Sequence, residues 1–78
     1  MTRLAQPPKH PKAALQEWTA AQKRKAPDYE VTEAAGPDHA RRFTVTVRVN
    51  GVGEAIGKGL SKQEAEREAA RAMLETLS

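Results

Sequence analysis

The chain contains no cysteine, which excludes both a disulfide framework and a zinc site built on thiolates. Its two histidines, His10 and His39, have no ligand partner at metal-binding spacing. No apolar run approaches the roughly 18 residues that a membrane-spanning helix needs. One tryptophan, one tyrosine and one phenylalanine leave few rings on which single-stranded bases could stack. These absences argue against a metalloenzyme, a membrane protein and a single-strand binder.

Size and charge set the next limits. Seventy-eight residues make one small domain with a modest core and little room for a deep catalytic cleft. Thirteen Lys and Arg against ten Asp and Glu give a net charge of +3, which leans toward an anionic partner. The acids are spread along surface faces, and no pair is placed for acid–base catalysis. The start lacks the layout of a signal peptide, so we expect a cytoplasmic location.

The N-terminal part predicts a tail followed by a helix. Residues 1–9 contain a proline pair and no periodic apolar face, so we interpret them as a linker or tail. A helix is expected from Pro11 to about Gln22. Its buried stripe is predicted to consist of Ala14, Leu15, Trp18 and Ala21. Gln16 and Glu17 fall off this stripe and should face outward.

The middle of the chain has the alternation of β-strands. Three strands are predicted, over residues 29–34, 43–49 and 52–57. The second strand alternates apolar and polar residues without exception. Asn50-Gly51 is a strong signal for a two-residue hairpin, and Gly53 is a candidate bulge. The cluster Gly36-Pro37-Asp38-His39 predicts a turn between the first two strands.

The C-terminal part predicts a long helix, from Lys62 to Leu77. One apolar line along this helix consists of Ala65, Ala69, Ala72 and Met73. Its many alanines permit close packing on a flat partner. The element order α-β-β-β-α therefore predicts an α+β fold, in which a three-stranded antiparallel sheet packs both helices on one face.

The stretch from Gly57 to Glu66 is the most informative one. It is interpreted as the end of a strand, a glycine turn and the first turn of the last helix. Ser61 is a good N-cap and forms a capping box with Glu64. Glycines on both sides of Lys58 would let a ligand approach the backbone. Lys62 opposes the helix dipole unless an anion such as a phosphate binds there. An ordinary strand-to-helix connection with a solvated lysine is the alternative.

Together these segments resemble the double-stranded RNA-binding domain, most closely the C-terminal domain of bacterial ribonuclease III. The resemblance covers about His10 to Leu77, so we assign residues 10–78 to this domain. It rests on Pro11 to Trp18, Pro27-Asp28-Tyr29, Gly36-Pro37-Asp38-His39, Phe43-Thr44-Val45, Gly57 to Glu66 and Ala69-Ala70. It implies an α-β-β-β-α fold, in agreement with the prediction from the residue pattern.

The resemblance implies three contacts on one side of an RNA duplex. The first helix, with Gln16 and Glu17, would contact one minor groove and its 2′-hydroxyls. The loop with Pro37 and His39 would enter the next minor groove, and Lys62 would meet phosphates across the major groove between them. Such a domain spans roughly 16 base pairs and reads A-form shape. The implied RNA-binding residues are Gln16, Glu17, Pro37, His39, Lys58, Ser61, Lys62 and Gln63.

The last helix departs from the family pattern at its start. The family typically has Lys-Lys-x-Ala-Lys, whereas this chain has Lys62-Gln63-Glu64-Ala65-Glu66, so one of three lysines remains. Gln63 can still donate a hydrogen bond to a phosphate but adds no charge. Few charged contacts imply a weak to moderate affinity and a shallow salt dependence, since the slope is roughly 0.9 per neutralised phosphate.

The resemblance also implies a larger parent protein. If the parent is ribonuclease III, residues 1–9 join this domain to a separate nuclease domain that holds the magnesium, and no catalytic site or cofactor is expected here. We expect the isolated domain to be a monomer and the parent a homodimer. A protein-interaction or dimerisation module of the same fold is the first alternative, which an exposed apolar patch would favour. A small enzyme is the second.

Overall fold

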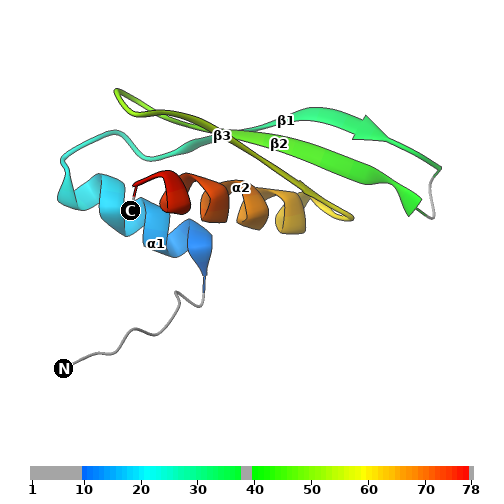
Figure 1. Cartoon of the computed structure of the whole chain (residues 1–78), viewed down its shortest axis with the longest axis horizontal. Coiled ribbons are helices and arrows are strands. Elements are labelled where there is room, and N and C mark those ends of the chain that lie inside the picture. The colour runs from blue at the N-terminus through cyan, green and yellow to red at the C-terminus, as the bar shows by residue number, and fades with distance from the viewer. Residues whose placement is uncertain (1–9, 38–39, 78) are drawn as a thin grey trace.

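The computed structural model describes residues 10–37 and 40–77. Its elements are α1 (Pro11–Ala21), β1 (Asp28–Ala35), β2 (Arg42–Val49), β3 (Gly53–Gly59) and α2 (Lys62–Leu77). Figure 1 shows the sheet as one layer and both helices as a second layer beneath it. This arrangement confirms the predicted α-β-β-β-α order and the α+β fold class. The linker predicted for residues 1–9 lies outside the described residues.

The sheet has the order β1-β2-β3, with both pairs antiparallel and β2 in the centre. The period of two in β2 sends Val45, Val47 and Val49 into the core, where each is at most 2% exposed. The alternate side chains of β2 point to the opposite face, which no helix covers. The sheet therefore has one face packed on α2 and one face open to solvent.

Two local features of the sheet differ from the prediction. The register shifts in β1 between Val31 and Glu33, so the bulge lies at Thr32 and not at Gly53. The hairpin between β2 and β3 is a three-residue loop, closed by a hydrogen bond from the Val52 N–H to the Val49 carbonyl at 3.0 Å. The Thr32 hydroxyl explains the first difference, because it reaches the Thr44 carbonyl at 3.3 Å across the bulge.

The contact between α2 and the sheet is unusually close. Ala65, Ala69 and Ala70 are fully buried beneath the sheet together with Met73. A Cβ atom on Gly57 of β3 would stand 2.0 Å from the backbone nitrogen of Ala69. Alanine on the helix and glycine on the strand thus bring the two backbones together, which larger side chains would prevent.

The core face of α1 differs from the predicted stripe by one residue. Leu15 and Thr19 are buried, whereas Ala21 is exposed. Thr19 lies four positions after Leu15 and about 40° around the helix from it, while Ala21 lies about 120° away. The Thr19 hydroxyl donates to the Gln16 carbonyl at 2.8 Å, so a polar residue can occupy this core position.

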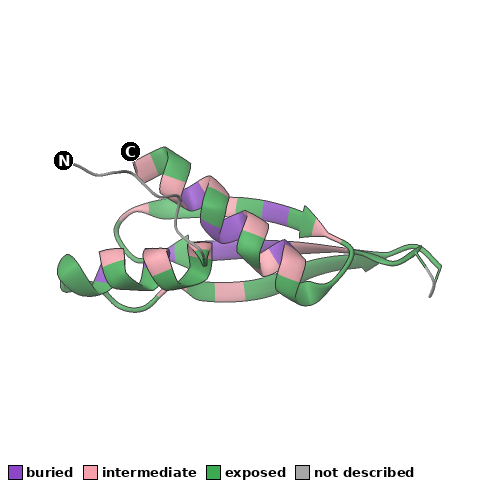
Figure 2. Cartoon of the chain, turned by 90° about the horizontal axis from the view of Figure 1, so that it is seen from below, coloured by how far each residue is buried: buried purple, intermediate pink, exposed green. Residues whose placement is uncertain are grey.

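The hairpin of β1 and β2 extends beyond the helices. Figure 2 shows its outer end as exposed ribbon that neither helix covers. Val31, which pairs with the buried Val45, is still 39% exposed. Gly36 and Pro37, which follow β1, and Ala40, which precedes β2, therefore lie at the outer end of this hairpin, away from the hydrophobic core.

Candidate nucleic-acid interface

Two side-chain hydrogen bonds close the start of α2. The Glu64 N–H donates to the Ser61 hydroxyl at 3.1 Å, and the Glu64 carboxylate accepts from the Leu60 N–H at 2.6 Å. They confirm the capping box, with the difference that the carboxylate reaches Leu60 instead of Ser61. Lys62 is exposed and has no ion-pair partner in the part of the chain that the structure describes. Its ammonium group is therefore available to an anion.

Lys58 lies within β3 and not in a glycine turn, which corrects the prediction for this stretch. Lys58 pairs with Thr44, and its two glycine neighbours pair with β2 as well. Gly57 is required by the contact with α2 described above, and a Cβ on Gly59 would stand 2.9 Å from the Ala65 nitrogen. Both glycines thus serve the packing of the helix, and ligand access does not explain them.

The structure separates Lys58 from the groove between the helices. Lys58 lines a hollow of about 340 Å³ together with Arg42, Glu64 and Glu68. Two carboxylates in this hollow offset its two cations, so it attracts an anion less than Lys62 does. Lys58 is the predicted RNA-binding residue that the fold supports least.

A second groove, between α1 and the start of α2, brings together two predicted contacts. Its volume is about 390 Å³, and it is lined by His10, Lys12, Ala13, Gln16, Gln63 and Arg67. Gln16 and Gln63 come from different helices, and each presents an amide with two donors and an acceptor. Among the described residues no acidic side chain lines this groove. Glu17 is exposed on α1 but does not line it.

The turn between β1 and β2 is partly described. Pro37 is exposed, and its carbonyl accepts from the Ala40 N–H at 2.9 Å. Gly36 has a φ of +101°, a conformation that favours glycine. His39, the other predicted contact in this turn, lies outside the described residues. Pro37 thus lies at the end of the projecting hairpin, away from both helices.

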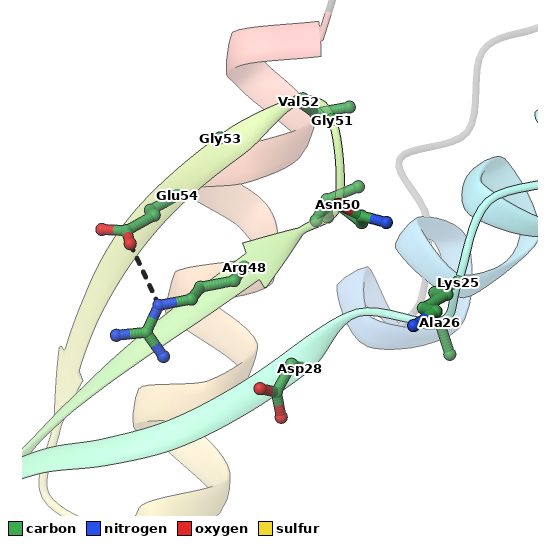
Figure 3. Close-up of a pocket in the computed structure, with 10 residues that line it drawn as sticks. Lys25, Ala26, Asp28, Arg48, Asn50, Gly51, Val52, Gly53 and Glu54 are labelled. Carbon is green, nitrogen blue, oxygen red and sulfur yellow. Dashed lines mark hydrogen bonds and ion pairs between the residues drawn. The ribbon is translucent and has the colours of Figure 1, made fainter.

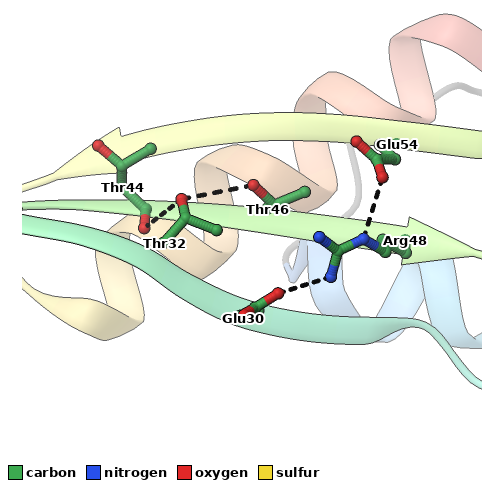
Figure 4. Close-up of polar contacts among 6 residues, drawn as sticks. All are labelled: Glu30, Thr32, Thr44, Thr46, Arg48 and Glu54. Carbon is green, nitrogen blue, oxygen red and sulfur yellow. Dashed lines mark hydrogen bonds and ion pairs between the residues drawn. The ribbon is translucent and has the colours of Figure 1, made fainter.

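The open face of the sheet is charged but internally paired. Arg48 donates to Glu30 at 2.7 Å and to Glu54 at 3.0 Å, from the strands on either side (Figure 4). The hydrogen bond to Glu30 and the one to Glu54 raise the pKa of the Arg48 guanidinium above its ordinary value. Beside them, the Thr32 and Thr46 hydroxyls approach each other at 3.5 Å. Arg48 therefore already has two anionic partners.

Another hollow lies at the far end of the sheet. It has a volume of about 540 Å³ around the β2–β3 hairpin, and Figure 3 shows Asp28, Arg48 and Glu54 along its wall. The charges there are mixed, and Lys25 completes the set from the segment after α1. None of the predicted RNA-binding residues lines this hollow.

One side-chain cluster beside the groove has no signal in the sequence. Lys12 forms an ion pair with Glu66 at 2.6 Å, and its ammonium stands 5.0 Å from the centre of the Tyr29 ring. Burial raises the pKa of the Tyr29 hydroxyl to about 12, and the nearby Glu66 carboxylate adds to the shift. The cluster joins α1, β1 and α2 beside the groove, through residues that are far apart in the sequence.

Neither a metal site nor a membrane-spanning helix is found in the part of the chain that the structure describes. Within residues 10–37 and 40–77, no three His, Cys, Asp or Glu side chains gather as a metal site would require. No helix in these same residues is long and apolar enough to cross a membrane.

The fold and the groove define a compact α-β-β-β-α domain with a paired-helix surface. The family profile described as "Double-stranded RNA binding motif" matches residues 11–77. The chain belongs to this family, as the sequence resemblance suggests.

Two bacterial ribonucleases are similar to this chain. Ribonuclease 3 of Zymomonas mobilis is 54% identical over 71 residues, which are 91% of this chain and 29% of that protein. Ribonuclease 3 of Caulobacter vibrioides is 57% identical over 68 residues, again 29% of its length. The chain thus spans less than a third of these relatives.

Solved structures agree with the family assignment. A structure of Arabidopsis HYL1, described with its implications for miRNA processing, superposes with a TM-score of 0.75 at 33% identity. The match covers 86% of this chain and 94% of that one. The solution structure of both dsRBDs of DRB4 matches 85% of this chain with a TM-score of 0.68 at 31% identity.

Proposed function

We propose that this domain binds double-stranded RNA by the A-form shape of the duplex, through contacts to 2′-hydroxyls and phosphates. The observation that carries the proposal is the groove between α1 and α2, where Gln16 and Gln63 meet without an acidic residue in the described lining. Lys62 stands unpaired at the start of the same helix. Family membership supports the same partner.

The three contacts have distinct chemical roles in this proposal. Gln16 and Glu17 face a minor groove. The Gln16 amide can donate hydrogen bonds to 2′-hydroxyls and accept them, whereas the Glu17 carboxylate can only accept. Lys62 and Gln63 meet phosphates across the major groove, with Ser61 holding the helix start in place. Pro37 and His39 enter the next minor groove from the tip of the hairpin. Lys58 contributes at most long-range attraction.

We further propose that the domain holds substrate for a ribonuclease III-like endoribonuclease. The identity to two bacterial ribonucleases supports this role, and the chain's small share of their length fits a domain of a larger enzyme. In this proposal residues 1–9 are the linker to a dimeric, magnesium-dependent nuclease part in the cytoplasm. The isolated domain (residues 10–78) is a monomer that needs no cofactor to bind RNA.

A protein-interaction module of the same fold is less well supported. Among the described residues, three large apolar side chains are more than a third exposed, namely Val31, Ile56 and Leu60. Ile56 lies on the open face of the sheet, beside its cross-strand partner Thr46. Val31 lies on the other face, and Leu60 lies between β3 and α2. Single apolar residues at separate places do not make the contiguous patch that marks a protein interface.

The test is a titration of the chain against a duplex RNA of about 20 base pairs, slightly longer than the span of such a domain. Duplex DNA of the same sequence is the control, because it lacks the 2′-hydroxyl and has different grooves. We expect clear preference for RNA. Equal affinity for both duplexes would overturn shape recognition, and no RNA binding at low salt would overturn the function itself.

A further inference from the structure

The groove between α1 and α2 contains a cation to which neither the sequence motifs nor the proposed contacts assign a role. Arg67 lines this groove beside Gln63, which lies one helical turn earlier on α2. Gln16 lines it from α1. The groove thus joins the first proposed contact of the duplex to the third, and Arg67 belongs to the same lining.

The acids next to Arg67 on α2 have other partners, so none of the described residues forms an ion pair with it. Glu64, three positions before it, accepts from the Leu60 N–H in the helix cap. Glu66 is paired with Lys12, and Glu68 is paired with Arg71. Each carboxylate that α2 could offer to Arg67 is therefore engaged elsewhere.

The other basic groups near the groove are in a different situation. Lys12 is held by Glu66 at 2.6 Å, so much of its charge is compensated. Arg71 is held by Glu68 at 2.6 Å and by Glu75 at 3.1 Å. Arg67 is exposed and makes no ion pair within the described ranges 10–37 and 40–77. It is therefore the permanent cation of the groove that an anion can bind without first breaking an ion pair.

We propose that Arg67 forms a fourth RNA contact, in which its guanidinium binds a backbone phosphate that enters the groove between Gln16 and Gln63. This inference rests on the proposed function and deepens it. A guanidinium is suited to this role because its planar fork can bind two phosphate oxygens at once. The two flanking amides add donors for the same phosphate or its neighbours. The contact adds positive charge to a helix start at which Gln63 and Glu66 stand in place of two family lysines.

The experiment compares Arg67→Gln with Arg71→Gln. Both substitutions remove one positive charge from exposed positions of α2, one turn apart, so Arg71→Gln is the matched control. Each variant and the unchanged chain are titrated with the RNA duplex at several salt concentrations between about 50 and 200 mM. Circular dichroism spectra and thermal unfolding verify that each variant is folded.

We expect Arg67→Gln to weaken RNA binding by about tenfold at low salt and to lower the slope of log K against log salt by about one. Arg71→Gln should leave the slope unchanged, because its guanidinium already has two partners. Arg67→Lys should keep the slope and lose part of the affinity, because lysine binds phosphate as a point charge. The Arg67 Nε–H resonance should shift when duplex is added.

The outcomes separate the two proposals. If the unchanged chain binds RNA but Arg67→Gln has the slope of Arg71→Gln and the Arg67 resonance does not move, the fourth contact is wrong and the function stands. If the unchanged chain does not bind duplex RNA, the proposed function fails and the fourth contact fails with it.

Discussion

The open face of the sheet and the groove between the helices both carry arginine, but the surroundings of the two arginines differ. On the sheet, Arg48 lies between Glu30 and Glu54 and donates to both. In the groove, Arg67 lies on a helix whose nearby carboxylates bind Leu60, Lys12 and Arg71 instead. The same side chain is therefore neutralised in one place and available in the other.

This difference shows that the availability of a charge matters more for binding than its exposure. The ion pairs of Arg48 are at the surface, where solvent screening leaves such pairs little influence on stability. They nevertheless occupy the donors that a phosphate would need. The net charge of +3 does not reveal this, because it counts Arg48 and Arg67 equally.

The largest expected effect concerns stability, and it compares the two faces of the sheet at neighbouring residues of β3. Gly57 faces α2 and Lys58 faces outward. Gly57→Ala should destabilise the domain by about 3 kcal/mol, since the added Cβ would collide with the Ala69 backbone 2.0 Å away. Lys58→Ala should change the free energy of unfolding by less than about 0.5 kcal/mol. Chemical denaturation measures both, and equal midpoints would contradict the close packing of α2 on β3.

The next effect concerns RNA affinity on the two faces. Lys62→Gln should weaken binding to the RNA duplex on the order of tenfold at low salt, because it removes an unpaired cation from the start of α2. Arg48→Gln should leave the affinity unchanged, because its donors are already bound to carboxylates. Fluorescence anisotropy measures both variants. A larger loss of affinity for Arg48→Gln than for Lys62→Gln would place the RNA on the sheet face. It would contradict the conclusion that the ion pairs of Arg48 make it unavailable.

The buried hydroxyl of Tyr29 beside the Lys12–Glu66 ion pair predicts a smaller, pH-dependent effect on stability. The Tyr29 hydroxyl is buried beside Lys12 and Glu66, and no described residue gives it a hydrogen bond. Tyr29→Phe should therefore stabilise the domain by up to about 1 kcal/mol at neutral pH, because an unsatisfied buried hydroxyl is costly.

The pKa of Tyr29 fixes the sign of its pH dependence. Its value is about 12 in the folded protein, against 10.0 ordinarily, so the unfolded chain loses the proton first as pH rises. The stabilisation that comes from the raised pKa of Tyr29 is fully present below pH 10 and should be lost between about pH 10 and 12. The advantage of Tyr29→Phe should grow over the same window. Because the chain has one tyrosine, tyrosinate absorbance reports this titration directly, and a midpoint near 10 would contradict it.

The smallest expected effect comes from removing the two carboxylate partners of Arg48. The double change Glu30→Gln and Glu54→Gln frees Arg48 from both partners and raises the net charge by two. Affinity for RNA and DNA duplexes should rise equally, by about twofold, because an unpaired surface cation attracts any phosphate backbone. Filter binding at low salt measures this. A gain for RNA alone would show that the sheet face takes part in shape recognition.

Much of the fold was predictable because it depends on short-range patterns. The bounds of α2 and the capping box at Ser61 follow from a few adjacent residues, and the structure has both. The alternation of β2 likewise gives its buried face. The bulge at Thr32 and the buried Thr19 were not predicted, because each depends on a partner elsewhere, the Thr44 carbonyl for one and the packing of α1 on α2 for the other.

The candidate site was predictable in part for the same reason. Gln16, Lys62 and Gln63 were identified by resemblance, and the structure places the two glutamines at one groove. Arg67 was missed, although its spacing of four from Gln63 put it on the same side of the helix. The glycines around Lys58 were assigned to a ligand, whereas the backbone of α2 is what approaches them.

The order of elements, the start of α2 and the family can be derived from the amino-acid sequence alone, since they depend on periodicity and capping over at most a few turns. Which charges are available depends on contacts between distant parts of the chain. Lys12 and Glu66 are 54 positions apart, and Arg48 meets acids from two other strands. The physical reason is that an ion pair depends on distance in space, which the folding of the whole chain sets.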